Sequence, residues 1–262
     1  MLDISVVVPV YNSADTLAEL VGRLDATMRN MAKSYEIVFV DDGSRDGSWD
    51  TVIRLQAERP NNVCGVRLMR NYGQHNALMC GFRHCRGDLI VTMDDDLQNP
   101  PEEIAKLHEA LVAGEFDLVY GNEKAKEHAR WRNLGSSLAR FFYRTVFRSS
   151  SSPTSFRIMT RQLMTSIVPY GLNYTYVDGL LAWNTQALGS VEVDHHERRV
   201  GRSGYSVGKL LVLALNLFTN FSLLPLQFVS LCGLLAALAG FVLGLFYLGQ
   251  FMLANIAVPG FA

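Results

Sequence analysis

The strongest constraint on the fold is an apolar run near the C-terminus. Residues 228–249 contain no Asp, Glu, Lys, Arg or His. Because an α-helix rises ~1.5 Å per residue, this run of about 22 residues is long enough to cross the ~30 Å hydrocarbon core of a membrane. A helix so long and so uniformly apolar is unusual inside a soluble domain. We therefore predict a transmembrane helix over residues 227–250.

A less uniform apolar segment precedes this run. Residues 207–226 contain Lys209, two asparagines and Pro225, which favours helices that lie in the membrane interface over a further span. Basic residues stand just ahead of it, and positive charge usually flanks the cytoplasmic side of a span. They are Arg198, Arg199, Arg202 and Lys209. We therefore expect residues 1–206 to form a cytoplasmic domain and residues 251–262 to lie across the membrane.

The charge balance and the cysteines argue against several classes of protein. The 24 basic and 25 acidic residues nearly cancel, so no strong field favours nucleic acid as a partner. The four cysteines include no C-x-x-C pair, and we interpret them as reduced residues in a reducing compartment. The N-terminus has no basic segment ahead of its first apolar run, so we expect no signal peptide.

Apolar, β-branched runs alternate with amphipathic segments through the first part of the chain. The runs, typical of strands buried on both faces, are residues 4–10, 35–40, 63–69, 89–93 and 118–120. The segments between them predict helices, and we expect Asn12 or Ser13 to cap the first. Strand alternating with helix predicts an α/β fold with a Rossmann-like, mainly parallel sheet.

Polar side chains follow each of the first four apolar runs directly. These clusters are Tyr11-Asn12, Asp41-Asp42, Arg70-Asn71 and residues 94–98. Sheets of this kind bind ligands outside the carboxyl ends of their strands, so the clusters predict an active site. The first strand is not followed by G-x-G-x-x-G or by a P-loop motif, which disfavours a dehydrogenase or a P-loop kinase.

The densest of these clusters is the run Asp94-Asp95-Asp96-Leu97-Gln98. If the backbone stays extended past the strand, Asp94, Asp96 and Gln98 project to one side. Hard oxygen ligands at this spacing suit Mg²⁺ or Mn²⁺ together with substrate phosphates. A solvated acidic turn ahead of the next helix is the simpler interpretation. The position directly after a buried strand favours the metal site.

Two further clusters allow more than one interpretation. Asp41 and Asp42 precede Gly43, and they could accept hydrogen bonds from a base or ribose or be solvated acids beside a helix N-cap. Adjacent His195 and His196 would face opposite sides of a strand, so we interpret them as structural residues. No G-x-S-x-G motif or Cys/His arrangement indicates a covalent nucleophile.

Several ordered motifs together resemble a known family. They are Val8-Pro9-Val10-Tyr11-Asn12, Val40-Asp41-Asp42-Gly43-Ser44, Arg70-Asn71-Tyr72-Gly73-Gln74-His75, residues 94–101 and the late basic motif from Glu197 to Tyr205. In this order they resemble the family 2 glycosyltransferases of the GT-A fold, and among these the polyprenyl-phosphate glycosyltransferases. The resemblance covers most of the chain. It implies inverting transfer of a sugar from a UDP- or GDP-linked donor to undecaprenyl or dolichyl phosphate, which makes a lipid-linked sugar for cell-envelope glycans.

The resemblance also implies roles for individual residues. Asp94, Asp96 and Gln98 would hold the Mg²⁺ or Mn²⁺ ion that bridges the diphosphate, and Asp96 would be catalytic. The substrate-binding residues would be Pro9, Tyr11, Asp41, Asp42, Gln74, Asp94, Arg198 and Ser203. Arg132 and Arg198 would be catalytic residues facing phosphates of the donor or of the lipid acceptor, because the guanidinium fork suits phosphate.

Three features depart from the family pattern. Gly204 stands where the late motif commonly has lysine, so one phosphate contact is missing or is supplied by a neighbouring arginine. Ser151 stands where an aspartate is usual ahead of Phe156-Arg157. The family usually has two or more membrane helices, so the resemblance implies either a second span beyond residue 262 or a single-span form.

Two alternative functions stay open. A sugar or protein hydroxyl as acceptor would require a carboxylate base, for which Asp178 and Asp194 are the later candidates. The other alternative is a non-enzymatic membrane scaffold that binds nucleotide. Motif letters do not identify the sugar, the nucleotide, the acceptor lipid or a homo-oligomeric state, because specificity depends on the shape of the pocket.

Overall fold

A computed structural model describes residues 2–123, 153–171, 175–196 and 224–254. The chain divides into two compact units, residues 1–204 and residues 205–262. The first unit contains the sheet and its helices, and the described part of the second is a single long helix. The predicted limits of the interfacial segment, residues 207–226, fall almost wholly outside the described residues, so those limits stay predictions.

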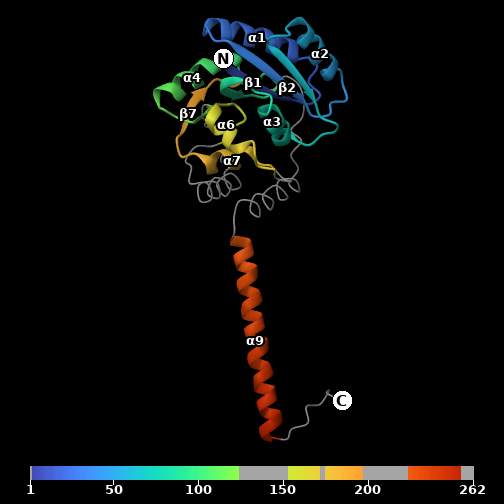
Figure 1. Ribbon diagram of the computed structural model, residues 1–262, viewed down its shortest axis with the longest axis vertical. Helices are drawn as coiled ribbons and strands as arrows, with labels where there is room; N and C mark the ends of the chain where they lie inside the picture. Colours follow the sequence, from blue (N-terminus) through green and yellow to red (C-terminus); the bar gives the residue numbers. More distant parts are fainter. Residues whose placement is uncertain (1, 124–152, 172–174, 197–223, 255–262) are drawn as a thin grey trace. The chain divides into compact units, whose positions relative to one another are not determined.

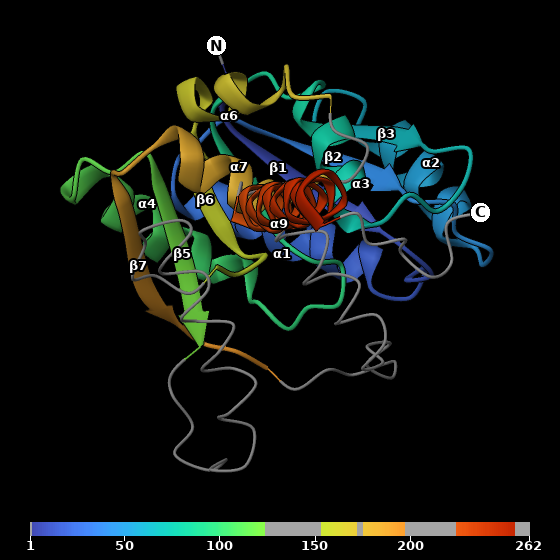
Figure 2. The same ribbon diagram turned by 90° about the horizontal axis from the view of Figure 1, so that it is seen from below.

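A seven-stranded sheet forms the centre of the first unit, with the order β3-β2-β1-β4-β6-β5-β7. The strands are β1 (Leu2–Val10), β2 (Tyr35–Asp41), β3 (Val63–Arg67), β4 (Gly87–Thr92), β5 (Leu118–Glu123), β6 (Arg157–Thr160) and β7 (Leu188–Val193). Strand β6 runs antiparallel to both β4 and β5, and the other neighbouring pairs are parallel. Figure 2 shows the strands fanning from β3 at one edge to β7 at the other. The predicted mainly parallel α/β sheet is confirmed.

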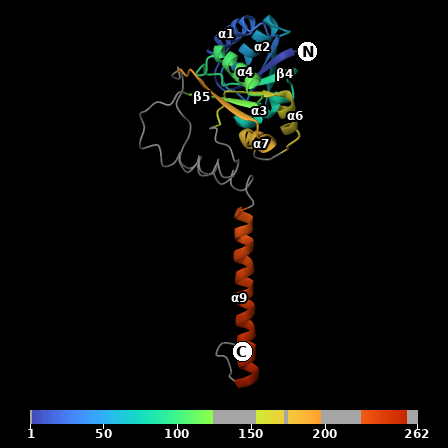
Figure 3. The same ribbon diagram turned by 90° about the vertical axis from the view of Figure 1, so that its left-hand side faces the viewer.

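Helices cover both faces of the sheet. They are α1 (Leu17–Asn30), α2 (Ser48–Glu58), α3 (Gln74–Phe82), the 3₁₀ turn η1 (Pro101–Glu103), α4 (Ile104–Ala113), α6 (Arg161–Ile167) and α7 (Val177–Asn184). Figures 1 and 3 show α1 and α2 on one face and α3 and α7 on the other. Helix α4 packs into the same apolar cluster as α1 and α2. The sheet is therefore the middle layer of three.

Strand β1 is buried on both faces of the sheet. Val6, Val8 and Val10 pack into the cluster that contains α1, α2 and α4, whereas Val7 lies on the opposite face, where a Cβ on Gly81 of α3 would contact it. All four valines are fully buried. Burying such a side chain contributes roughly 1.5–3 kcal/mol. The apolar run predicted as a strand buried on both faces is therefore the structural axis of the domain.

The five strands expected from sequence are all present, but the expected cap of the first helix is wrong. Helix α1 begins at Leu17, after Thr16. Asn12 has a positive φ of 55°, and the Ser13 N–H donates to Ser48 Oγ at 2.8 Å, so these residues form a turn held by α2. Strands β6 and β7 were not expected from the sequence.

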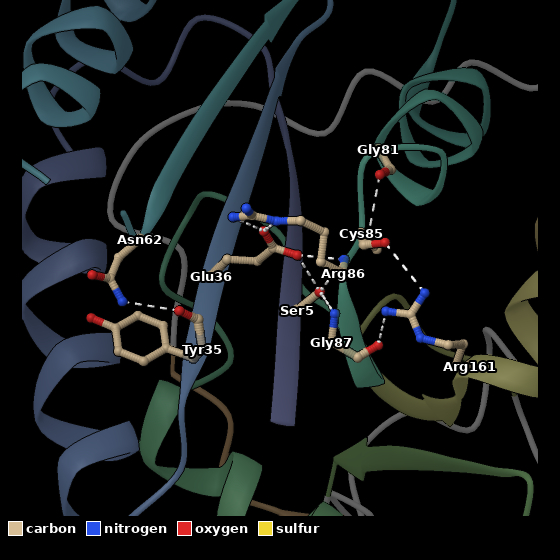
Figure 4. A network of polar contacts seen from close by, with 9 residues as sticks. All are labelled: Ser5, Tyr35, Glu36, Asn62, Gly81, Cys85, Arg86, Gly87 and Arg161. Carbon is tan, nitrogen blue, oxygen red and sulfur yellow. Dashed lines mark hydrogen bonds and ion pairs between the residues drawn. The ribbon is translucent and has the colours of Figure 1, made fainter. Parts of the chain in front are cut away.

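A buried polar network joins three strands at their amino ends, opposite the carboxyl ends where the polar clusters lie (Figure 4). Glu36 of β2 is 1% exposed. It accepts hydrogen bonds from Ser5 Oγ of β1 at 2.7 Å and from Arg86 Nε at 2.7 Å, and Ser5 Oγ accepts the N–H of Gly87 of β4. A buried carboxylate with such partners is satisfied. The network therefore fixes this end of the sheet.

The described part of the second unit is helix α9 (Leu224–Ala254). Residues 226–253 form a 28-residue stretch that contains an 18-residue window with a mean hydropathy of 2.4, so the helix is long and apolar enough to cross a membrane. At ~1.5 Å per residue it extends about 42 Å, beyond the ~30 Å hydrocarbon core. Pro225 lies in the first turn of α9, where proline is tolerated.

Candidate active site

The carboxyl ends of β1, β2 and β3 lie in register. Val10 pairs with Asp41, and Asp41 pairs with Arg67. The Asp42 N–H donates to the Val10 carbonyl at 2.9 Å, and the Leu68 N–H donates to the Asp41 carbonyl at 2.9 Å. The loops that follow the three strands therefore start side by side, as the polar clusters predicted.

A cavity of about 430 Å³ lies among these loops. It is lined by Tyr11, Gly43, Ser44, Arg45, Arg67, Leu68, Met69, Arg70 and Asn71. Gly43 has a φ of +74°, and a Cβ there would lie 2.8 Å from backbone atoms of Arg70 and Asn71. Only glycine permits this close approach of two loops. Tyr11, one of the residues predicted to bind substrate, lines the cavity directly.

Asp41 and Asp42 support the wall of this cavity rather than line it. Both carboxylate oxygens of Asp42 accept backbone N–H groups, from Tyr72 at 2.7 Å and from Gly73 at 2.8 Å. Burial raises the pKa of Asp42. Asp41 is fully buried; its Oδ1 accepts the Ser44 N–H, and its Oδ2 lies 3.2 Å from Arg67 Nε. A direct contact of either carboxylate with a nucleotide stays a prediction.

The run at residues 94–98 forms a turn, so the expected extended backbone is wrong. Leu97 has a positive φ of 60° and is 3% exposed. This conformation turns the leucine into the core, which anchors the loop. Asp95 accepts the Tyr11 N–H at 3.1 Å, and burial raises its pKa to about 6. Asp95 thus joins this loop to the end of β1.

The two outer carboxylates of the run have different surroundings. Asp94 accepts hydrogen bonds from Gln74 Nε2 at 2.6 Å and from Ser155 Oγ at 2.6 Å. Asp96 Oδ1 accepts the backbone N–H of Gln98 at 3.1 Å, within the turn. Gln74, predicted to bind substrate, therefore contacts the predicted metal site. Ser155 was not predicted, because a single serine just ahead of a short strand carries no sequence pattern.

The two histidines close this loop from the other side. His195 Nε2 lies 3.4 Å from Gln98 Nε2, and His195 Nδ1 lies 3.3 Å from Asn99 Oδ1. The His196 N–H donates to the Gln98 carbonyl at 2.8 Å. A neutral imidazole with its proton on Nδ1 satisfies both side-chain contacts. The structural interpretation of the pair is consistent with these contacts, which hold the loop that carries Gln98.

Behind Asp94 lies a buried ion pair between Arg157 of β6 and Asp178 of α7. Arg157 is 1% exposed and Asp178 is 7% exposed. Arg157 Nε also donates to Thr92 Oγ1 at 3.0 Å, and the Tyr120 hydroxyl donates to Asp178 at 3.2 Å. The sequence signal that could have indicated this pair is the charged Arg157 inside the apolar run 156–159, since a buried charge requires a partner.

These contacts bear on the alternative in which a carboxylate acts as base. Asp178 is committed to the Arg157 guanidinium and to Tyr120, and turning its carboxylate toward an acceptor hydroxyl would leave the buried Arg157 charge without its partner. The Asp194 N–H donates to Glu103 Oε2 at 3.2 Å. Asp178 is therefore better explained as a structural residue than as a base.

The donor atoms of Asp94, Asp96 and Gln98 fit a hard divalent ion. The part of the chain that the structure describes has no group of three or more His, Cys, Asp and Glu side chains able to hold a metal. Mg²⁺ typically takes only one or two carboxylates and completes its shell with water and substrate phosphates. The Gln98 amide has its nitrogen beside His195, which leaves its oxygen for another partner. The set fits an ion shared with a phosphorylated substrate.

Several predicted residues cannot be placed. Arg132, Arg198 and Ser203 lie outside the described residues, as do Ser151 and Gly204. Pro9 is described and lies in β1, paired with Val40 of β2. The structure therefore brings together Tyr11, Gln74 and the loop at residues 94–98, and the predicted phosphate-binding arginines remain untested.

Comparison with known proteins agrees with this geometry. The profile described as glycosyl transferase family 2 matches residues 5–166, which include all four polar clusters. Three similar proteins are each named undecaprenyl-phosphate 4-deoxy-4-formamido-L-arabinose transferase. The protein from Edwardsiella ictaluri is 40% identical, and the match covers 91% of this chain and 74% of that protein. The protein from Pectobacterium carotovorum is 36% identical, with 94% of this chain and 76% of that protein covered. The protein from Pseudomonas paraeruginosa is 40% identical, with 94% of this chain and 73% of that protein covered.

Solved structures of similar fold include glucosyl-3-phosphoglycerate synthase from Mycobacterium tuberculosis. Its complex with Mn²⁺, UDP and phosphoglyceric acid superposes with a TM-score of 0.61 at 20% identity, covering 82% of this chain and 78% of that one. This likeness supports the GT-A fold. Together with the profile match and the 36–40% identical relatives, it leads to one conclusion: the chain belongs to glycosyl transferase family 2 and is a glycosyltransferase.

Proposed function

We propose that this glycosyltransferase moves a sugar from a nucleotide-sugar donor to a polyprenyl phosphate, with inversion at the anomeric carbon and with Mg²⁺ or Mn²⁺. The observation that carries the proposal is the position of Asp94, Asp96 and Gln98 at the carboxyl end of β4, beside the cavity among the β1, β2 and β3 loops. Relatives at 36–40% identity are named for transfer to undecaprenyl phosphate, which supports this class of acceptor.

The cavity of about 430 Å³ suits the base and ribose of the donor. Tyr11, which is 48% exposed, lines the cavity, and a base can stack on its aromatic ring. Arg45 and Arg70 also line the cavity and supply donors for oxygen-rich groups. A UDP-linked donor is supported by the fold, since a solved structure of similar fold is a complex with UDP.

The metal would be held by Asp94, Asp96 and Gln98 with the diphosphate of the donor. When bound, such an ion stabilises the negative charge that develops on the departing nucleoside diphosphate. The chain's own residues keep this site in place: Asp95 fastens the loop to the Tyr11 backbone, and the buried Leu97 anchors it to the core. By resemblance, Arg132 and Arg198 would contact phosphates.

The acceptor chemistry does not require a protein base. The second pKa of a phosphate monoester is near 6, so a polyprenyl phosphate is mostly a dianion at pH 7. One of its oxygens forms a bond to the anomeric carbon while the bond from that carbon to the nucleoside diphosphate breaks. The commitment of Asp178 to Arg157 and Tyr120 fits this mechanism better than attack by a hydroxyl group.

Helix α9 would place the enzyme on the membrane that holds its lipid substrate. Its stretch of residues 226–253 is long enough to span, and its outward side chains are suited to lipid. The basic residues ahead of it support a catalytic domain on the cytoplasmic side. Nucleotide sugars and the ionised lipid phosphate would then meet at that surface.

The test uses the full chain in lipid nanodiscs with labelled UDP- and GDP-sugars and undecaprenyl phosphate. We expect metal-dependent labelling of the lipid by the wild type and its loss in Asp96→Ala. Asp88→Ala, which changes an aspartate that is 56% exposed at the opposite end of β4, serves as the matched control. Retained transfer by Asp96→Ala would refute the metal assignment. Labelling of sugar or protein hydroxyls in place of the lipid phosphate would refute the acceptor.

A further inference from the structure

Asp94 is held on both of its carboxylate oxygens by side chains from distant parts of the chain. Gln74 Nε2, from the first residue of α3, donates to Oδ1 at 2.6 Å, and Ser155 Oγ, just ahead of β6, donates to Oδ2 at 2.6 Å. Hydrogen bonds to an ionised acceptor are shorter and stronger than neutral ones. Two such bonds from opposite sides leave the carboxylate little freedom to rotate.

Ser155 is itself fixed by the buried network behind the site. Its carbonyl oxygen accepts the Thr92 hydroxyl at 2.6 Å, and Thr92 Oγ1 accepts Arg157 Nε at 3.0 Å. Thr92 and Arg157 are also paired across β4 and β6. Arg157 is anchored by Asp178. The hydroxyl that reaches Asp94 therefore comes from a backbone that is restrained on both sides.

We propose that Ser155 and Gln74 are positioning residues, which fix the orientation of Asp94 and so set the affinity of the site for its divalent ion. This inference rests on the proposed function for the presence of the ion. It explains why an antiparallel strand with a buried arginine lies beside β4. The strand delivers the Ser155 hydroxyl to the carboxylate. Partners of this kind change metal affinity by about 10- to 100-fold when they are removed.

The experiment measures Mn²⁺ binding directly, apart from activity. The full chain in nanodiscs, with UDP present, is titrated with Mn²⁺ while electron paramagnetic resonance reports the free ion. We expect Ser155→Ala to weaken Mn²⁺ binding about 10- to 100-fold and Ser155→Thr, which keeps the hydroxyl, to restore most of it. Ser166→Ala is the matched control, since that hydroxyl bonds only the Leu163 carbonyl of its own helix among the contacts described.

Gln74→Ala tests the same carboxylate from the side of α3. It should also weaken Mn²⁺ binding, and the loss in the double variant should differ from the product of the single losses, because both residues act on one group. If Ser155→Ala does not fold, the Mn²⁺ affinities of Gln74→Ala and Ser155→Thr test the inference in its place. Mn²⁺ affinity within twofold of wild type in folded Gln74→Ala or Ser155→Ala overturns the inference.

The outcomes also separate this inference from the proposed function. If the wild type binds Mn²⁺ in the presence of UDP but labels no polyprenyl phosphate, the proposed acceptor is refuted. The positioning roles of Ser155 and Gln74 are then still tested by the Mn²⁺ titration of the variants. A wild type that binds no Mn²⁺ in the presence of UDP overturns both. A purely structural role for Ser155 predicts a lower thermal midpoint in Ser155→Ala with unchanged Mn²⁺ affinity, and that result also overturns the inference.

Discussion

Removing the Asp178 carboxylate should destabilise the domain strongly, because it leaves a buried charge without its partner. Arg157 is 1% exposed, and besides Asp178 it donates to Thr92. Burial lowers the pKa of the Arg157 guanidinium, but the nearby Asp178 carboxylate raises it, and the net shift of this pKa is upward. In Asp178→Ala the guanidinium would stay charged and buried, and breaking such a pair costs about 3–5 kcal/mol.

The expected change in thermal midpoint follows from the size of the domain. For a domain of this size, 1 kcal/mol shifts Tm by about 2–4 °C, so Asp178→Ala should lower Tm by roughly 6–20 °C. All three tryptophans of the chain, at positions 49, 131 and 183, precede α9. Tryptophan fluorescence of the full chain in detergent therefore reports the unfolding of the catalytic domain.

An exposed ion pair provides the matched control. Asp88 lies 3.8 Å from Arg161, and the two side chains are 56% and 37% exposed. Such a surface pair contributes about 0–1 kcal/mol, so Asp88→Ala should shift Tm by no more than a few degrees. If the Tm of Asp178→Ala lies within 2 °C of the wild-type value, the buried ion pair between Arg157 and Asp178 does not stabilise the domain as argued. Loss of transfer without loss of stability would then return Asp178 to the candidates for a base.

Three other perturbations test separate parts of the structure. Gly43→Ala should weaken nucleotide binding at least tenfold by calorimetry, because a Cβ there meets backbone at 2.8 Å where φ is +74°; unchanged UDP affinity would contradict the cavity assignment. Burial lowers the pKa of His75, so the unfolded chain binds its proton first as pH falls. Stability should then decline as pH drops through about 6.5, and His75→Gln should flatten that decline in urea unfolding curves. Leu238→Arg near the middle of α9 should reduce membrane insertion by about 2.5–3.5 kcal/mol in a translocon assay, and Leu253→Arg at its end much less; equal effects would argue against a span.

The sequence by itself determined the layers of the fold and the edge at which chemistry occurs. Buried parallel strands require long apolar, β-branched runs, and these are visible in residues 4–10 and 35–40 without any structure. Since ligands bind at the carboxyl ends of such strands, the polar clusters after them identified the site. Hydropathy alone likewise indicated α9, because twenty or more uncharged residues have few other stable environments.

Only the tertiary structure decided how the site residues divide their work. Asp94, Asp95 and Asp96 are neighbours in sequence, yet one is held by Gln74 and Ser155, one fastens the loop to Tyr11, and one caps its own turn. The left-handed Leu97 that separates them depends on a core formed by distant helices. Strand β6, which begins at Arg157, and Ser155 just ahead of it were equally hidden. The physical reason is that hydrogen-bond partners 20 to 84 residues apart are chosen by packing, which no local pattern records.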